Sequence, residues 1–347
     1  MKDYGALLAA IAVPRLTGTR GNERVRELLK SELTARGLVV LEHAFRASPR
    51  SLRTVAVTGI VVAVGAAGSA GLAVRPAAGL LAWAALAVLL LVIGIALGPR
   101  RAVAEADAVT LIGVRPRTRI AVWLVAHYDG KGQPISMATR ILGVVLVALQ
   151  LPALALFAAL GASPAAALCF LPGLVGGLIL ARNRATADSP GALDNGSGVV
   201  TALSTLDALP PDCPVGVIFP DAEEFGLLGA RALVRERANL LEGTAVINFD
   251  GIDDRGRTIA LVHRPGATVA AVVQSLGLKP ARRLPMVEDG LALAPAAREC
   301  MTIMRGDWRT ATVVHTPRDT VARLTLAGSG TVAAAVARAL AGTLPVR

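Results

Sequence analysis

The sequence is poor in aromatic side chains, cysteines and acidic residues. Aromatic residues make up only 3% of its 347 positions, and 25 acidic residues stand against 36 basic ones. The three cysteines, Cys169, Cys213 and Cys300, show no CxxC spacing and cannot all pair, so we expect reduced packing residues. The net charge of +11 comes without basic runs carrying interleaved aromatic residues and without a binding motif, and we expect no nucleic-acid partner.

Charge is also missing from long stretches of the chain. Residues 54–74 and 76–98 contain no charged side chain and are separated only by Arg75. Each stretch is long enough to cross a bilayer core of roughly 30 Å. A further uncharged stretch, 141–181, is too long for one span, and the sequence GASP at 161–164 divides it. The sequence therefore predicts two transmembrane hairpins, 54–98 and 141–181, with four spans.

An alternative is that these stretches are buried core helices of a soluble protein. A globular helix normally keeps a polar stripe, and these stretches have none, which favours an integral membrane protein in a lipid bilayer. The apolar N-terminal run LLAAIAV is too short for a secretory signal. Arginines flank the outer ends of the predicted hairpins: Arg46, Arg50, Arg53, Arg100, Arg101, Arg140, Arg182 and Arg184. By the positive-inside rule, we expect the polar bulk of the protein and both termini in the cytoplasm.

The segments outside the hairpins, 1–53, 99–140 and 182–347, are expected to form one α/β domain. Strand patterns cover 38–45, 108–114, 120–126, 214–219 and 244–249, and helical patterns cover 22–36, 196–208, 225–239, 267–276 and 328–343. Strands that alternate with helices are typical of a mixed, mostly parallel sheet flanked by helices. Ligands of such sheets bind beyond the carboxyl ends of the strands.

The residues at those strand ends are unusually polar. They are His127 and Asp129 after 120–126, Glu223 and Glu224 after 214–219, and Asp250 after 244–249, and two loops add Asp194 and His315. Each has an ordinary explanation when taken alone. An acidic pair is favoured in the first turn of a helix, and an aspartate before Asn-Gly commonly makes a turn. The strand-end position makes the whole set a candidate functional site.

Five ordered motifs carry a resemblance to a known family. They are AHYDG at 126–130, GALDNGSGVV at 191–200, DAEEFGLLGA at 221–230, INFDG at 247–251 and HTPRDT at 315–320. This set resembles the co-catalytic di-zinc aminopeptidases of metallopeptidase family 28, whose clan also includes glutamate carboxypeptidases and glutaminyl cyclases. The resemblance implies a zinc aminopeptidase-like fold and the hydrolysis of N-terminal peptide bonds in a peptide substrate.

The resemblance also implies a ligand set for two zinc ions. Asp194 would be the carboxylate that bridges both metals. His127 and Asp250 would complete one site, and Glu224 and His315 would complete the other. Imidazole nitrogen and carboxylate oxygen are normal zinc ligands, although cobalt or manganese could occupy similar sites.

The same resemblance implies roles for Glu223 and Asp129. Glu223 would act as the acid–base residue, taking a proton from water and delivering it to the leaving amine. We expect the pair to lie in extended backbone, so that Glu224 turns to a metal while Glu223 faces the water. Asp129 would hold the imidazole of His127 in the required tautomer.

The chain departs from the family pattern in two ways. The segment between His127 and Asp194 is a short loop in such relatives and here contains the second predicted hairpin, so we expect the active site close to the membrane surface. The residue that stabilises the developing oxyanion is not identified. A carboxypeptidase or other amide hydrolase on the same scaffold, and an inactive membrane scaffold, stay open as alternatives.

Overall fold

The computed structural model describes residues 2–48, 50–74, 106–150, 167–280 and 287–344, with isolated positions at 81, 84, 88, 152 and 156. The chain divides into two compact units. Unit 1 comprises Met1–Ser48, Ala106–Gly132 and Thr186–Arg347, and unit 2 comprises Pro49–Glu105 and Gln133–Ala185. The segments of unit 2 contain both predicted hairpins, although the structure does not test whether these lie in a membrane.

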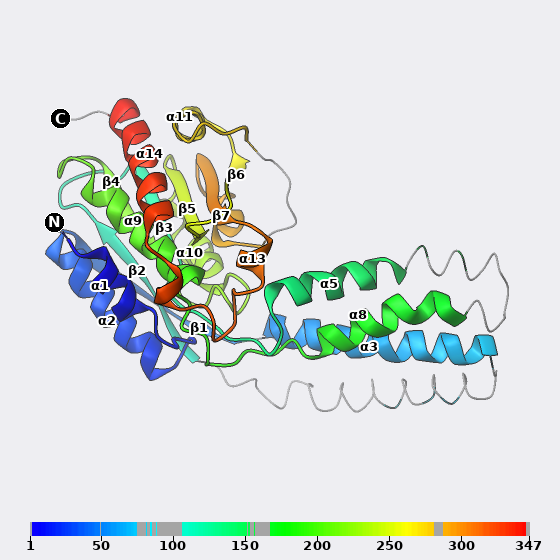
Figure 1. Cartoon of the computed structure of the whole chain (residues 1–347). Coiled ribbons are helices and arrows are strands. Elements are labelled where there is room, and N and C mark those ends of the chain that lie inside the picture. The colour runs from blue at the N-terminus through cyan, green and yellow to red at the C-terminus, as the bar shows by residue number, and fades with distance from the viewer. Residues whose placement is uncertain are drawn as a thin grey trace. The chain divides into compact units, whose positions relative to one another are not determined.

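Unit 1 is built on a seven-stranded mixed sheet (Figure 1). Its strands are β1 (Val39–Ala47), β2 (Ala106–Val114), β3 (Val122–Val125), β4 (Val215–Phe219), β5 (Ala245–Ile252), β6 (Arg257–Arg264) and β7 (Glu299–Gly306). They lie in the order β1-β2-β4-β3-β5-β7-β6. The pairs β4/β3, β3/β5 and β5/β7 are parallel, and the other three pairs are antiparallel. The mixed sheet is confirmed, but only its central strands are parallel.

Helices cover both faces of this sheet. They are α1 (Tyr4–Ile11), α2 (Arg20–Ala35), α9 (Gly198–Asp207), α10 (Leu228–Arg237), α11 (Ala267–Ser275), α12 (Asp289–Leu293), α13 (Trp308–Ala311) and α14 (Ala327–Thr343). Successive residues of a strand point to opposite faces. In β3, Leu124 packs into the larger core cluster with α1, α2, α9, α11 and α14, whereas Trp123 packs into the smaller one with α10 and α12. Burial on both faces explains why the central strands are continuous apolar runs.

Helix α2 shows how the local sequence sets an element. The Thr19 side chain caps its N-terminus by accepting a hydrogen bond from the backbone N–H of Asn22. Val25, Leu29 and Leu33 recur every four residues and are fully buried, so one face of the helix packs on the core. The helix predicted over 22–36 is therefore confirmed.

The described residues of unit 2 include the apolar helices α3 (Arg50–Val74), α5 (Met137–Ala148) and α8 (Leu171–Ala181), and the short 3-10 turn η1 (Leu168–Phe170). Helix α8 packs closely against α3: a Cβ atom on Gly177 would lie 2.6 Å from the Ala63 nitrogen and 2.6 Å from the Gly59 oxygen. It also packs against α5, where a Cβ on Gly176 would lie 2.8 Å from the Gly143 oxygen.

One helix among the described residues is long and apolar enough to cross a membrane by length and composition, over Val55–Leu72. The segments Met137–Ala148 and Leu168–Ala181 are shorter apolar helices. The predicted second span of the first hairpin, 76–98, and the GASP turn at 161–164 lie outside the described residues, apart from the isolated positions 81, 84 and 88. The two hairpins and the four spans therefore stay predictions.

Candidate metal centre

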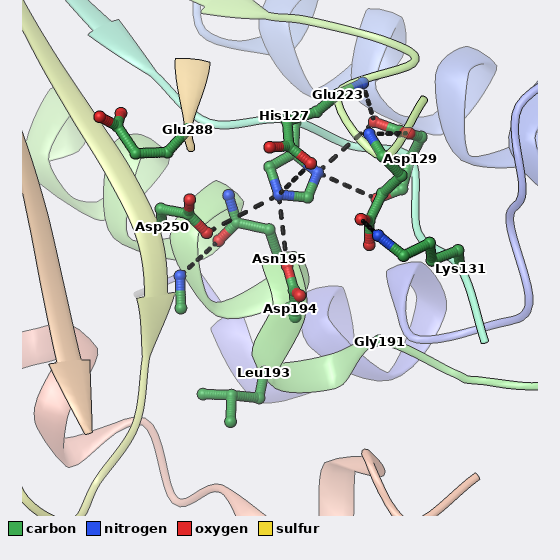
Figure 2. A network of polar contacts seen from close by, with 12 residues as sticks. His127, Asp129, Lys131, Gly191, Leu193, Asp194, Asn195, Glu223, Asp250 and Glu288 are labelled. Atoms are coloured by element: carbon green, nitrogen blue, oxygen red, sulfur yellow. Dashed lines mark hydrogen bonds and ion pairs between the residues drawn. The ribbon is translucent and has the colours of Figure 1, made fainter. Parts of the chain in front are cut away.

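Neighbouring parallel strands bring the first part of the site together. Strands β4, β3 and β5 lie side by side, so their carboxyl ends meet at one edge of the sheet. His127 lies just beyond β3, Glu223 and Glu224 follow β4, and Asp250 lies near the end of β5. Figure 2 shows His127, Glu223 and Asp250 converging with Asp194 at this edge.

Five candidate residues form two groups that share one carboxylate. In the first group, His127 Nε2 lies 3.3 Å from Asp194 Oδ1 and 3.8 Å from Asp250 Oδ1. In the second group, His315 Nε2 lies 3.0 Å from Asp194 Oδ2 and 3.1 Å from Glu224 Oε1. Within each group, the three candidate ligand atoms all lie within 4.8 Å of one another. Asp194 thus presents one oxygen to each group, which is the arrangement that a bridging carboxylate requires.

These residues fit divalent metal ions. Two imidazoles and three carboxylates are ordinary zinc ligands, and three protein donors at an ion leave a position for water. The Glu224 Oε1 atom is buried and lies 3.1 Å from His315 Nε2. A buried carboxylate is costly unless cations or hydrogen-bond donors satisfy it, and a divalent ion between these two side chains would do so.

The charges of the site also favour a bound metal cation. Burial opposes protonation of His127, but the charge of Glu223 and the side-chain interactions with the carboxylates of Asp129, Asp194 and Asp250 outweigh it and raise the pKa of this imidazole well above its ordinary value. The side chains therefore create a strongly negative potential at the His127 ring. A metal cation would satisfy that potential as a proton does.

Asp194 is held by a second aspartate through its backbone. It lies in the segment η2 (Ala192–Ser197), where Asp194 and Asn195 have non-helical backbone angles, and its peptide bond to Asn195 is cis. Asp319 accepts hydrogen bonds from the backbone N–H of Leu193 at 2.7 Å and of Asp194 at 3.1 Å. The position of the shared carboxylate is therefore fixed by the HTPRDT motif that also supplies His315.

The side chain of Asn195 ties this turn to β5. Its Nδ2 donates to the Phe249 carbonyl at 2.8 Å, and its Oδ1 accepts from the Gly251 N–H at 3.1 Å. These two residues flank Asp250. The amide thus sets the distance between the two carboxylates of the first group.

Asp129 serves both His127 and the glutamate pair. Its Oδ1 lies 3.4 Å from His127 Nδ1, and its backbone carbonyl lies 3.2 Å from the same nitrogen. Its two carboxylate oxygens also accept hydrogen bonds from the backbone N–H of Glu223 at 3.1 Å and of Glu224 at 3.2 Å. The sequence suggested that Asp129 contacts His127, but it did not suggest the hydrogen bonds from the backbone of the glutamate pair.

The expectation of extended backbone at Glu223 and Glu224 is wrong. The Glu223 carbonyl accepts hydrogen bonds from Gly226 at 2.8 Å and Leu227 at 2.7 Å, so the pair opens a tight turn that precedes α10. The two side chains nevertheless diverge. Glu223 Oε2 lies 4.0 Å from His127 Nε2, whereas Glu224 reaches the second group. The pair therefore lies before the first helical turn of α10. This excludes the explanation that the two glutamates are there because acidic residues are favoured in the first turn of a helix.

The two glutamates have opposite electrostatic environments. Burial raises the pKa of Glu223 well above its ordinary value; the charge of His127 opposes this shift, and the charges of Glu224, Asp289 and Asp250 add to it. Burial acts in the same direction on Glu224, but the charges of His315 and Lys131 outweigh it and lower its pKa to about 2. Glu223 thus favours holding a proton, and Glu224 favours staying ionised.

Arg15 is a fully buried cation that sequence reasoning did not assign to the site. Its Nε donates to the Tyr128 carbonyl at 2.6 Å, and its two terminal nitrogens donate to the carbonyls of Pro190 at 2.5 Å and Gly191 at 2.8 Å. The guanidinium therefore clamps the segment after β3 to the segment that leads into Asp194. Arg15 stands in PRLTGT at 14–19, outside the five motifs that carry the resemblance, so those motifs gave no signal of this role.

Lys131 was also missed. Its Nζ donates a hydrogen bond to Glu224 Oε2, and both side chains are almost completely buried. The lysine directly follows the AHYDG motif. Nothing in its sequence position distinguishes it from a solvated surface lysine.

Two further buried aspartates lie near the centre. Asp221 accepts hydrogen bonds from Thr17 at 2.9 Å, Asn22 at 3.0 Å and Tyr128 at 2.9 Å, which makes it a structural residue. Asp289 is 1% exposed, and neither of its carboxylate oxygens has a hydrogen-bond partner among the described residues. The charges of His127 and Asp250 act on it, so it lies within electrostatic reach of the first group.

The model of peptidase family M28 matches residues 110–340, a span that contains every candidate ligand. The chain belongs to peptidase family M28. Family membership makes this M28 protein a metallopeptidase-type hydrolase. No curated protein matches the sequence.

Solved structures share the fold of this M28 protein. The zinc aminopeptidase BSAP from Bacillus subtilis is 13% identical, with a TM-score of 0.58 over 98% of this chain and 94% of that one. An aminopeptidase from Aneurinibacillus is 11% identical, with a TM-score of 0.59 over 99% and 94%. A glutaminyl cyclase from Porphyromonas gingivalis is 14% identical, with a TM-score of 0.54 over 97% and 96%. At these identities the likeness shows the fold alone.

Proposed function

We propose that this protein is a membrane-bound di-zinc aminopeptidase. The observation that carries the proposal is the pair of three-residue groups joined by Asp194. His127 and Asp250 would hold one zinc ion with Asp194, and Glu224 and His315 would hold the other. When bound, the ions would supply Lewis acidity, which polarises a peptide carbonyl and lowers the pKa of water.

Glu223 supplies the proton transfer in this proposal. It belongs to neither ligand group, yet its Oε2 lies 4.0 Å from Nε2 of His127. Its carboxylate takes a proton from the attacking water as the new C–O bond forms. It then gives that proton to the leaving amine nitrogen as the C–N bond breaks.

The charge of the site favours the amino end of a peptide. Asp289 is buried without a hydrogen-bond partner among the described residues, and an ammonium group at a peptide N-terminus would satisfy its carboxylate. A carboxypeptidase would need a cation for the C-terminal carboxylate. The buried cations near the centre, Arg15 and Lys131, already bind backbone carbonyls and Glu224.

Hydrolysis assays on the purified protein test this choice. We expect cleavage of peptides with a free N-terminus and no cleavage of the same peptides after N-acetylation. Cleavage of both sets would replace the aminopeptidase with a different amide hydrolase. Zinc bound without turnover of either set would favour an inactive scaffold.

The apolar surface of unit 2 supports the membrane part of the proposal. Exposed side chains on its helices include Ile141, Leu142, Val144, Val145, Leu171, Val175 and Leu178. Exposed positions of a helix in water are normally polar. Glycines also allow α3, α5 and α8 to approach closely, which is typical of helix packing in membranes.

Membrane fractionation tests this part separately. We expect the protein to stay in the membrane pellet after alkaline carbonate washing and to be released only by detergent. Gly177→Leu should weaken packing inside unit 2, because a side chain there meets the backbone of α3. Gly330→Leu on α14 is the matched control, since no atom lies within 4 Å of a Cβ at that position. Release of the wild-type protein by carbonate alone would contradict insertion.

A further inference from the structure

Glu224 uses its two carboxylate oxygens differently. Oε1 lies 3.1 Å from His315 Nε2 and belongs to the second ligand group. Oε2 accepts a hydrogen bond from Lys131 Nζ. The side chains of Lys131 and Glu224 are 5% and 3% exposed, so water does not compete for this contact. The lysine and the candidate ligand His315 therefore contact different oxygens of the same carboxylate.

The backbone around Lys131 is fixed on both sides. Gly130 N–H donates to the Arg15 carbonyl at 3.3 Å. Gly132 and Thr186 exchange two backbone hydrogen bonds of 2.8 Å each. A Cβ atom at Gly132 would lie 1.7 Å from Oδ1 of Asp188 and 2.4 Å from Oγ1 of Thr186, so a larger residue there would displace these two side chains. The main chain thus presents the lysine side chain to Glu224 from a defined position.

A buried ion pair of this kind needs a reason beyond stability. Removing both charges from water is expensive, and a well-packed apolar pair of similar volume is often as stable. The lysine also places a positive charge beside a cation site, which opposes metal binding. The gain must therefore lie in how Glu224 is held.

We infer that Lys131 is a positioning residue that restricts Glu224 to one metal-binding oxygen. The inference rests on the proposed function. Carboxylates bind metals through one oxygen or through two, and catalytic zinc keeps a position open for water beside three protein donors. When Lys131 holds Oε2, the metal has three donor atoms, one each from Asp194, Glu224 and His315. If Glu224 supplied both oxygens, it would fill the position that water needs.

The test compares wild type, Lys131→Met and Lys131→Arg after zinc loading. Methionine keeps the length of the side chain and removes its charge and its donors, whereas arginine keeps both. Lys279→Met, at an exposed position, is the matched control for the substitution itself. Zinc content, the binding mode of Glu224 in a crystal structure, and peptide turnover are measured for each protein.

We expect wild type to show Glu224 bound through Oε1 with Lys131 on Oε2. Lys131→Met should keep the zinc content of wild type, bind zinc through both oxygens of Glu224, and lose turnover by at least about tenfold. Lys131→Arg should restore one-oxygen binding and most of the turnover. A lysine that has left Glu224 in zinc-loaded wild type would overturn the inference, as would one-oxygen binding in Lys131→Met.

These outcomes are separable from a failure of the proposed function. A wild-type protein that binds zinc but hydrolyses no peptide would remove the aminopeptidase, while the binding mode of Glu224 would still decide the role of Lys131. If Lys131→Met does not fold, Lys131→Gln keeps a neutral donor for Oε2 and is predicted to preserve one-oxygen binding. Two-oxygen binding in Lys131→Gln would contradict the inference.

Discussion

The carboxylate of Asp129 accepts a hydrogen bond from the backbone N–H of Glu223 at 3.1 Å. The same carboxylate lies 3.4 Å from Nδ1 of His127. One side chain therefore sets the orientation of a candidate metal ligand and the position of the candidate acid–base residue. This double attachment couples the loop after β3 to the turn after β4.

Asp129→Asn tests that coupling. The two backbone N–H groups of Glu223 and Glu224 donate to separate oxygens of Asp129, and in asparagine one of these oxygens is replaced by an NH2 group, which cannot accept. We expect turnover to fall by about 10–100-fold, with weaker zinc binding, because a residue that orients metal ligands is lost. Steady-state kinetics and zinc titration measure the two effects. Asp107→Asn, at an exposed position, is the control, and equal behaviour of the two variants would exclude the assigned role.

Glu223→Gln separates proton transfer from metal binding. Glutamine keeps the shape of the side chain but cannot accept and return a proton. We expect the zinc content of wild type and a loss of turnover of about 10²–10⁴-fold. Zinc analysis and peptide hydrolysis are measured on the same preparation. Turnover near the wild-type value would show that another group moves the proton.

Arg15→Lys tests the clamp that holds the approach to Asp194. The planar guanidinium reaches three carbonyls from separate nitrogens, and an ammonium group has only one nitrogen from which to donate. We expect the free energy of unfolding to fall by about 3 kcal/mol, since buried hydrogen bonds from a charged group are lost. Thermal unfolding is the measurement, with Arg24→Lys at an exposed position of α2 as the control. A change no larger than that of the control would contradict the clamp.

Asp221 predicts a pH dependence of stability. Burial, followed by the charge of Asp129, raises the pKa of Asp221 to about 6 in the folded protein, above its ordinary value of 3.8. The folded state therefore binds more protons between these values, and the contribution of Asp221 to the free energy of unfolding falls as pH rises from about 4 to about 6. This loss is on the order of 3 kcal/mol.

Asp221→Asn removes that titration. The unfolding midpoints of wild type and variant are measured from pH 4 to pH 7. As pH rises, the midpoint of the variant should increase relative to that of wild type. The variant also loses hydrogen bonds, which produces an offset that does not depend on pH. A difference between the two proteins that stays constant over this range would contradict the assigned pKa.

The central strands were predictable from sequence, and so was the convergence of the candidate site residues at one edge of the sheet. Strands β3, β4 and β5 are continuous apolar runs that end in polar residues, and parallel strands bring such ends to one edge. Strands β6 and β7 were missed because their apolar runs are short: β6 has only IALV between polar ends in RTIALVHR, and Thr302 interrupts the run of β7 in ECMTIMRG. The antiparallel edges of the sheet depend on pairings between distant segments, which local pattern does not encode.

The supporting residues of the site were less predictable than its candidate ligands. Asp194 and His315 stand in recognisable motifs, whereas Lys131 and Arg15 gain their roles only through contacts with Glu224 and with distant backbone carbonyls. The turn at Glu223 was misjudged because its geometry depends on Asp129 accepting both backbone N–H groups. Such roles follow from tertiary contacts and not from residue type.

The most direct test of the account is the zinc content of the purified protein and of its Asp194→Ala variant. Asp194 presents one oxygen to each ligand group, so its removal affects both metal positions. We predict about two zinc ions per folded wild-type chain and fewer than about one in the variant. A folded wild-type protein without zinc, or a variant with the wild-type content, would contradict the metal centre.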